Sequence, residues 1–175
     1  VDSSETSALG DTSESVTEIH VPDANKVAKK RNLGLQAATN DWVVYVDDDC
    51  TVAERTLNVF ASAIEDAEDS VAGYYPVTEF VGDRNLAFEC CHDTPFMRHF
   101  KKPEQGTDQI WGPHTLAVFD REALLAVEGF DESFALNAGG GDVDLGLRLT
   151  ERGYRLVGIP ETLVYHTTAT WNSVW

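Results

Sequence analysis

The sequence predicts a single α/β domain. The strand signal is clearest at residues 43–46, where four apolar, β-favouring residues lie between Asn40-Asp41 and three acids. A short run of this kind is typical of a strand buried on both faces, as in a parallel sheet. Helical spacing is clearest at 24–38, 54–69 and 142–152, where apolar residues recur on one stripe. Strands and helices within one chain of 175 residues indicate a single α/β domain with a real core.

The other elements follow from the same patterns. Gly153 ends the helix at 142–152, as a glycine beyond a helix C-terminus often does. We expect, in chain order, a strand at 71–81 bent at Pro76, an irregular excursion with a helical piece at 84–109, a strand at 115–119, a short helix at 121–127 capped by Asp120, and short strands at 156–159 and 162–165.

The charge balance excludes two classes of partner. The chain has 30 acidic and 13 basic residues, a net charge of −17. Nucleic-acid binding needs clustered Lys and Arg, and an anionic membrane surface would repel this chain. No apolar run approaches the roughly 20 residues that span a bilayer, so we expect membrane contact only through segments outside this chain. Because salt screens self-repulsion, so acidic a chain favours a halophilic source.

The cysteines indicate a reducing compartment, and we expect a cytoplasmic location that includes the inner face of the membrane. The three cysteines, Cys50, Cys90 and Cys91, are odd in number and lack the spacing of a disulfide framework. His92 follows Cys91, which leaves a Cys-Cys-His zinc site open, but without a CxxC or HxxxH spacing buried thiols are favoured.

Three acids directly follow the strand at 43–46. Alternation along a strand predicts that Asp47 and Asp49 point to one side and Asp48 to the other. Neighbouring carboxylates repel, and a divalent cation such as Mg²⁺ or Mn²⁺, which prefers carboxylate oxygen and bridges to phosphates, removes that repulsion. The alternative is a solvated acidic turn after the strand.

Three later features could join the same site. Glycines 139–141 let the chain bend before Asp142, which begins a helix. The alternative role of its charge is a favourable interaction with the helix dipole alone. His166 follows a short strand, although a lone histidine is more often a surface or core residue. Arg31, the last residue of the one basic cluster, and Asn32 beside it could face phosphates, whereas the lysines of the cluster suit a solvated helix face.

The order of these motifs resembles the family 2 glycosyltransferases of GT-A fold. Five segments carry the resemblance over nearly the whole chain: Ala28-Lys29-Lys30-Arg31-Asn32-Leu33-Gly34-Leu35, Asp41 through Asp49, Gly129-Phe130-Asp131-Glu132, Gly141 through Arg148, and Gly153-Tyr154 with Tyr165-His166. The resemblance implies a nucleotide-diphosphosugar-binding αβα sandwich with a mostly parallel central sheet. It also implies a donor-binding part at 1–110 and an acceptor and catalytic part at 111–175.

The resemblance assigns roles by position. It implies that Asp2, Arg31, Asp47 and Asp48 bind the donor, that Asp49 and His166 hold Mn²⁺ or Mg²⁺, and that Asp142 is the general base of an inverting transfer. It places Trp111, Gly141 and Asp144 on the acceptor side, where a glycan, lipid-linked or protein-linked hydroxyl would bind.

Two departures leave alternatives open. Gly141 stands where the family usually has Glu, and Val1 begins where the family has its second strand. A fragment of an active enzyme and a non-catalytic nucleotide-sugar-binding or metal-binding remnant both fit this start. A magnesium-dependent nucleotidyltransferase sharing the sandwich also remains open.

Overall fold

A computed structural model describes residues 1, 16–22, 26–83, 86–134 and 140–168. In chain order its elements are α1 (Val27–Ala37), β1 (Trp42–Val46), β2 (Cys50–Val52), α2 (Thr56–Glu65), β3 (Val71–Val81), α3 (Leu86–His92), α4 (Pro95–Arg98), the 3₁₀ turn η1 (Lys102–Gln105), β4 (Asp108–Gln109), β5 (Leu116–Asp120), α5 (Arg121–Ala126), α6 (Gly141–Glu151) and β6 (Arg155–Thr167).

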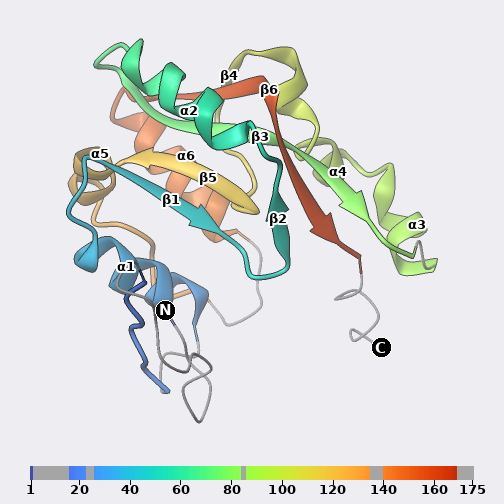
Figure 1. Cartoon of the computed structure of the whole chain (residues 1–175), viewed down its shortest axis with the longest axis horizontal. Coiled ribbons are helices and arrows are strands. Elements are labelled where there is room, and N and C mark those ends of the chain that lie inside the picture. Colours follow the sequence, from blue (N-terminus) through green and yellow to red (C-terminus); the bar gives the residue numbers. More distant parts are fainter. Residues whose placement is uncertain (2–15, 23–25, 84–85, 135–139, 169–175) are drawn as a thin grey trace.

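One mixed sheet forms the centre of the molecule, with strand order β1-β5-β3-β6-β2 and β4 beside β6 (Figure 1). The α/β class is therefore confirmed, but the expectation of a mostly parallel sheet is wrong. Among the described strands only β3 and β6 pair in parallel. The physical reason is the place of β5, which runs antiparallel to both β1 and β3, while β2 and β4 run against β6.

Two apolar layers flank the sheet, and β5 shows why. Leu116 and Val118 pack with Phe60 of α2, whereas Ala117 and Phe119 pack with residues of α5 and α6. Successive side chains of a strand point to opposite faces, so a continuous apolar run can serve both layers. Figure 1 shows α2 across the near face of the sheet and α6 behind it.

The strand β1 is an edge strand and is not buried on both faces as expected. Tyr45 is buried, but Val44 and Val46 are 46% and 47% exposed. Among the described strands β1 pairs with β5 alone, and of its residues only Trp42 joins the apolar layer that contains Phe60 of α2. An apolar run identifies a strand, but it does not tell how many of its faces are covered.

The strand β6 continues through both short strands expected at 156–159 and 162–165. Its pairing with β3 jumps from Pro76–Ile159 to Val77–Leu163, so residues 160–162 form an irregularity. Thr56 holds the second half of the strand, because its hydroxyl donates to Leu163 O and accepts from Leu163 N, both at 2.9 Å. This second half carries His166 to its place beside β2.

No helix among the described residues is both long and apolar enough to cross a membrane. Strands from both parts of the chain, 1–110 and 111–175, share the one sheet. The assignment of donor binding to the first part and of acceptor binding and catalysis to the second stays a prediction.

Candidate active site

The three acids lie in a turn between β1 and β2. Asp47 N donates to Thr115 O at 3.1 Å, which extends the ladder, and Cys50 N donates to Asp47 O at 3.1 Å, which closes the turn. The strand alternation expected for residues 47–49 therefore does not apply. Asp48 is exposed, while the side chains of Asp47 and Asp49 are 37% and 22% exposed.

Asp47 is paired with a basic residue of α1. Arg31 Nη2 donates to Asp47 Oδ1 at 2.9 Å, and the Arg31 side chain is only 14% exposed. Burial raises the pKa of Asp47, the Arg31 charge opposes that rise, and the charges of Asp49 and Asp142 add to it. The charges of Asp49, in the same turn, and of Asp142, in the first turn of α6, therefore both act on Asp47.

A buried histidine supports the other side of Arg31. Arg31 Nη1 lies 3.2 Å from His114 Nδ1, and since a guanidinium only donates, Nδ1 accepts. His114 is 1% exposed, and burial lowers its pKa to about 3, so the ring stays neutral. The rings of Tyr75 and Phe130 pack against it, and the Arg31 guanidinium lies 5.4 Å from the Phe130 ring centre.

Asp142 lies in the first turn of α6, as expected. Its Oδ2 accepts a long hydrogen bond of 3.4 Å from His114 N. The helix begins after Gly140, whose φ of 119° favours glycine. It also packs tightly on the chain before β5, because a Cβ on Gly146 would lie 2.5 Å from Ile110 O. These contacts keep Asp142 beside His114, and so close to Arg31 and Asp47.

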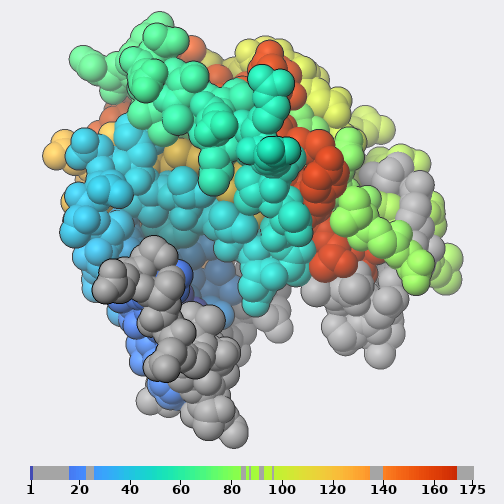
Figure 2. All heavy atoms as spheres, in the orientation of Figure 1, coloured from blue at the N-terminus to red at the C-terminus, as the bar shows by residue number. Residues whose placement is uncertain are grey.

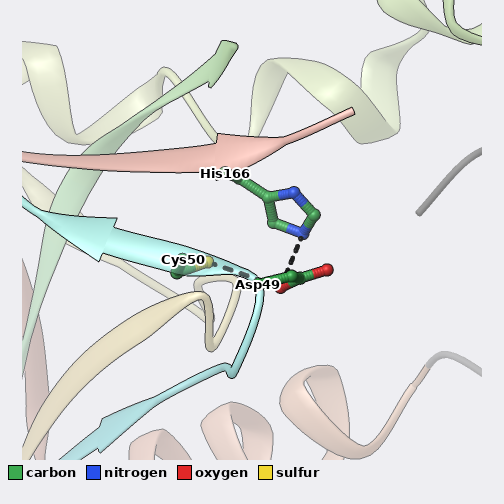
Figure 3. A group of neighbouring side chains, drawn as sticks. All are labelled: Asp49, Cys50 and His166. Carbon is green, nitrogen blue, oxygen red and sulfur yellow. Dashed lines mark hydrogen bonds and ion pairs between the residues drawn. The ribbon is translucent and has the colours of Figure 1, made fainter. Parts of the chain in front are cut away.

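Asp49, Cys50 and His166 form a compact group of possible metal ligands (Figure 3). One ligand atom from each lies within 4.8 Å of the other two. His166 Nε2 is 3.5 Å from Asp49 Oδ1, and Cys50 Sγ is 3.7 Å from the same oxygen. Burial, then the charges of Asp49 and Asp47, raise the pKa of the Cys50 thiol to about 12.

The protonation of His166 suits a metal ligand. Its Nδ1 lies 2.9 Å from Thr167 O, and a carbonyl only accepts, so Nδ1 carries a proton. Nε2 therefore faces the Asp49 carboxylate either as a protonated partner or with its lone pair. Metal-bound histidines commonly donate their other ring N–H to a carbonyl in this way. The carboxylate and imidazole of this pair thus fit a divalent cation.

A hollow of about 390 Å³ lies between α1 and β1, and Figure 2 shows these elements bordering a recess. Arg31, Asp47 and Asp48 are among the residues that line it. The structure therefore brings together three of the four residues predicted to bind the donor. The fourth, Asp2, lies outside the described residues.

The three acceptor-side residues have separate surroundings. Trp111 stacks on His99, with ring centres 4.2 Å apart. Gly141 begins α6, and a Cβ there would meet nothing within 4 Å. Asp144 forms two hydrogen bonds with Arg148, of 2.9 and 2.7 Å, which supports a structural role. Their assignment to the acceptor side stays a prediction.

Sequence reasoning assigned no role to His114 or Phe130, and considered Asn32 only as a phosphate contact beside Arg31. The Asn32 amide donates to Phe130 O and accepts from Phe130 N, both at 2.8 Å. Gly129 precedes this clamp with a φ of 68°, and a Cβ there would lie 2.5 Å from Asn32 Oδ1. The Arg31-Asn32 and Gly129-Phe130 motifs are therefore in direct contact in the fold. Neither motif alone predicts this contact from the sequence.

Comparison of the chain with known proteins identifies the enzyme class to which this fold and site belong. The family model described as glycosyl transferase family 2 matches residues 4–132. The chain belongs to glycosyl transferase family 2. The pre-mycofactocin glycosyltransferase of Mycobacterium tuberculosis is 30% identical over 159 residues, which are 90% of this chain and 33% of that protein. The chain thus spans about a third of the length of the curated relatives that it matches.

Solved structures share the GT-A fold. TarS residues 1–349 of S. aureus in complex with UDP-GlcNAc gives a TM-score of 0.65 at 15% identity, over 90% of this chain and 44% of that one. GalNAc-T7 with UDP, GalNAc and Mn²⁺ gives 0.64 at 13% identity, over 85% and 32%. The mannosyltransferase PcManGT of Pyrobaculum calidifontis with GDP-Man and Mn²⁺ gives 0.56 at 21% identity, over 86% and 39%. The expected GT-A fold is therefore confirmed.

Proposed function

We propose that this domain transfers a sugar from a nucleoside-diphosphate donor to an acceptor hydroxyl, with inversion and with the help of a divalent cation. The observation that carries the proposal is the convergence of Arg31, Asp47 and Asp142 on one site, with Asp49 and His166 at the end of the same turn. The family supports the reaction class, and fold relatives solved with UDP, UDP-GlcNAc or GDP-Man support the donor class.

Arg31 and Asp47 hold and orient the donor. One oxygen of Asp47 is taken by Arg31, which leaves Oδ2 to accept a hydrogen bond from a donor hydroxyl. Buried His114 accepts from Nη1 of Arg31 and Asp47 accepts from Nη2, so the guanidinium is held from two sides. Its fixed guanidinium therefore sets the position of Asp47 against the hollow between α1 and β1.

Asp49 and His166 would hold the cation. When bound, a divalent cation supplies positive charge that offsets the anionic diphosphate and the charge that grows on it. The strong negative charge of the chain makes this role necessary, because phosphates would otherwise approach a net charge of −17. The Mn²⁺ in two of the fold relatives supports a divalent cation without distinguishing Mn²⁺ from Mg²⁺.

Asp142 is the general base of the proposed reaction. Its Oδ2 already accepts from His114 N, so Oδ1 remains to take the proton of the acceptor hydroxyl. The hydroxyl oxygen forms a bond to the anomeric carbon as the carbon–oxygen bond to the diphosphate breaks, and the electron pair leaves with the diphosphate. Attack from the face opposite the leaving group inverts the anomeric centre.

The test measures release of nucleoside diphosphate from a panel of UDP-sugars and GDP-sugars in the presence of Mn²⁺. We expect Asp142→Asn to lower the rate by about 10²–10⁴ with little change in donor affinity. The matched control is Asp69→Asn, an exposed acid after α2, which should leave the rate unchanged. Full activity in Asp142→Asn would rule out the base. Donor binding without turnover in the unmodified chain would favour a non-catalytic binding domain.

A further inference from the structure

Cys50 lies opposite His166 in the sheet. The two residues are direct partners in the antiparallel ladder between β2 and β6. Directly opposite residues carry their side chains on the same face, with Cβ atoms roughly 5 Å apart. The stem of Cys50 packs beside the apolar layer under α2, while its sulfur faces Asp49 (Figure 3). The thiol is therefore held by the strand register in the same group as the two cation ligands.

Two of the three separations among the ligand atoms match those around one small cation. In tetrahedral zinc sites the metal lies about 2.0–2.1 Å from nitrogen or oxygen and about 2.3 Å from sulfur. Bonds of these lengths place two ligand atoms about 3.4 Å apart, or about 3.6 Å when one is sulfur. The observed distances are 3.5 Å from His166 Nε2 to Asp49 Oδ1 and 3.7 Å from Cys50 Sγ to the same oxygen. The two pairs that include Asp49 Oδ1 therefore need little rearrangement to share a cation, and the third pair, a His166 ring nitrogen and Cys50 Sγ, lies within 4.8 Å.

We propose that Cys50 is a third protein ligand of the cation held by Asp49 and His166, and that its sulfur makes the site prefer thiophilic ions such as Zn²⁺ and Co²⁺ to Mg²⁺. This inference rests on the cation site of the proposed function. One oxygen, one nitrogen and one sulfur donor form a set that Mg²⁺ binds poorly, whereas thiolate and imidazole ligands suit zinc. Binding replaces the S–H bond by a sulfur–metal bond, and the proton passes to solvent.

The remaining cysteines provide the control. Cys90 is exposed, and the Cys90-Cys91-His92 sequence offers sulfur and imidazole ligands that are neighbours in sequence, unlike Cys50 and His166. A doubly substituted Cys90→Ser, Cys91→Ser chain keeps Cys50 as its one thiol. A Cys50→Ser chain keeps the other two. Thiol ligation at one place can therefore be separated from ligation at the other.

The experiment titrates each chain with Co²⁺ and follows the sulfur-to-cobalt charge-transfer absorption in the near ultraviolet, with Mn²⁺ and Zn²⁺ affinities from calorimetry. We expect the band in the unmodified chain and in the Cys90/Cys91 variant, and its loss in Cys50→Ser. Zn²⁺ affinity should fall in Cys50→Ser by at least about 10-fold, because the loss of a group that only supports a metal ligand already costs about that much. Mn²⁺ affinity should change much less, since manganese favours oxygen ligands.

Two results would overturn the proposal and are distinguishable. Mn²⁺ binding that is lost in His166→Ala, together with no cobalt–sulfur band that depends on Cys50, would refute the role of Cys50 and leave the proposed function intact. Absence of binding of any of the three ions would refute both the role of Cys50 and the cation site of the proposed function.

Discussion

The clamp between Asn32 and the Phe130 backbone gives a prediction whose size can be worked out from the contacts. The Asn32 amide makes three hydrogen bonds: two with the Phe130 backbone at 2.8 Å and one with Glu132 Oε1 at 2.9 Å. A hydrogen bond contributes about 1 kcal/mol net, and an unsatisfied buried partner costs about 1–3 kcal/mol. Phe130 is 3% exposed, so water reaches its backbone poorly. We therefore expect Asn32→Ala to lower the free energy of unfolding by about 2–4 kcal/mol.

Urea denaturation followed by circular dichroism measures this change. The matched control is Asn40→Ala, at an exposed asparagine after α1, which should stay within about 0.5 kcal/mol of the unmodified chain. Asn32→Asp should not restore stability, because a carboxylate cannot donate to Phe130 O or to Glu132. A value for Asn32→Ala within about 0.5 kcal/mol of the unmodified chain would refute the clamp.

A double-mutant cycle tests the geometry of the same contact. Gly129→Ala should destabilise the chain both through its positive φ and through the 2.5 Å approach of its Cβ to Asn32 Oδ1. Removing the Asn32 side chain removes the second cost. The two substitutions together should therefore cost less than the sum of the single values, by about 0.5–3 kcal/mol. Strict additivity would mean that Gly129 and Asn32 do not meet.

Three further predictions concern stability. Burial lowers the pKa of His114 to about 3, so between about pH 6.5 and pH 3 the unfolded chain binds a proton at this ring that the folded chain does not. The free energy of unfolding should therefore fall on acidification, by up to about 1.4 kcal/mol per pH unit. His114→Gln should flatten the pH dependence of the urea midpoint. The pKa of His99 is also lowered and adds to the slope, while the raised pKa of Asp47 opposes it near pH 4. Gly146→Ala should destabilise the chain by about 1–3 kcal/mol, because the new Cβ would clash with Ile110 O. Gly34→Ala, in open space on α1, should instead stabilise the chain by up to about 1 kcal/mol. Equal shifts of the melting temperature in the two variants would contradict this. Melting temperatures should rise from dilute buffer to molar KCl because salt screens a net charge of −17, and full stability in dilute buffer would count against a halophilic source.

The sequence predicted the elements whose pattern is local. The bent strand at 71–81 and the helix at 142–152 correspond closely to β3 and α6, and Asp120 caps α5 by accepting from Ala123 N at 2.7 Å. The family resemblance also anticipated a contact between distant residues, since Asp49 and His166 lie together although they are far apart in the chain.

What the sequence left open depends on tertiary structure. The apolar run at 43–46 looked the same as a fully buried strand, but it forms the edge of the sheet because its one described partner is β5. Hydrophobic pattern does not encode strand order. The buried His114 gave no signal, because its role depends on Arg31 of a helix far away in sequence. The position of Cys50 beside His166 required the register of β2 against β6, which no local pattern specifies.

The central claim is that the acids of the turn after β1 act through a cation on the diphosphate of the donor. Its most direct test is calorimetric titration of UDP and GDP into the chain with and without Mn²⁺, for the unmodified protein and for Asp49→Ala. We predict that a nucleoside diphosphate binds the unmodified protein only when Mn²⁺ is present, and that Asp49→Ala abolishes this binding. Equal affinity with and without Mn²⁺, or unchanged binding in Asp49→Ala, would contradict the claim.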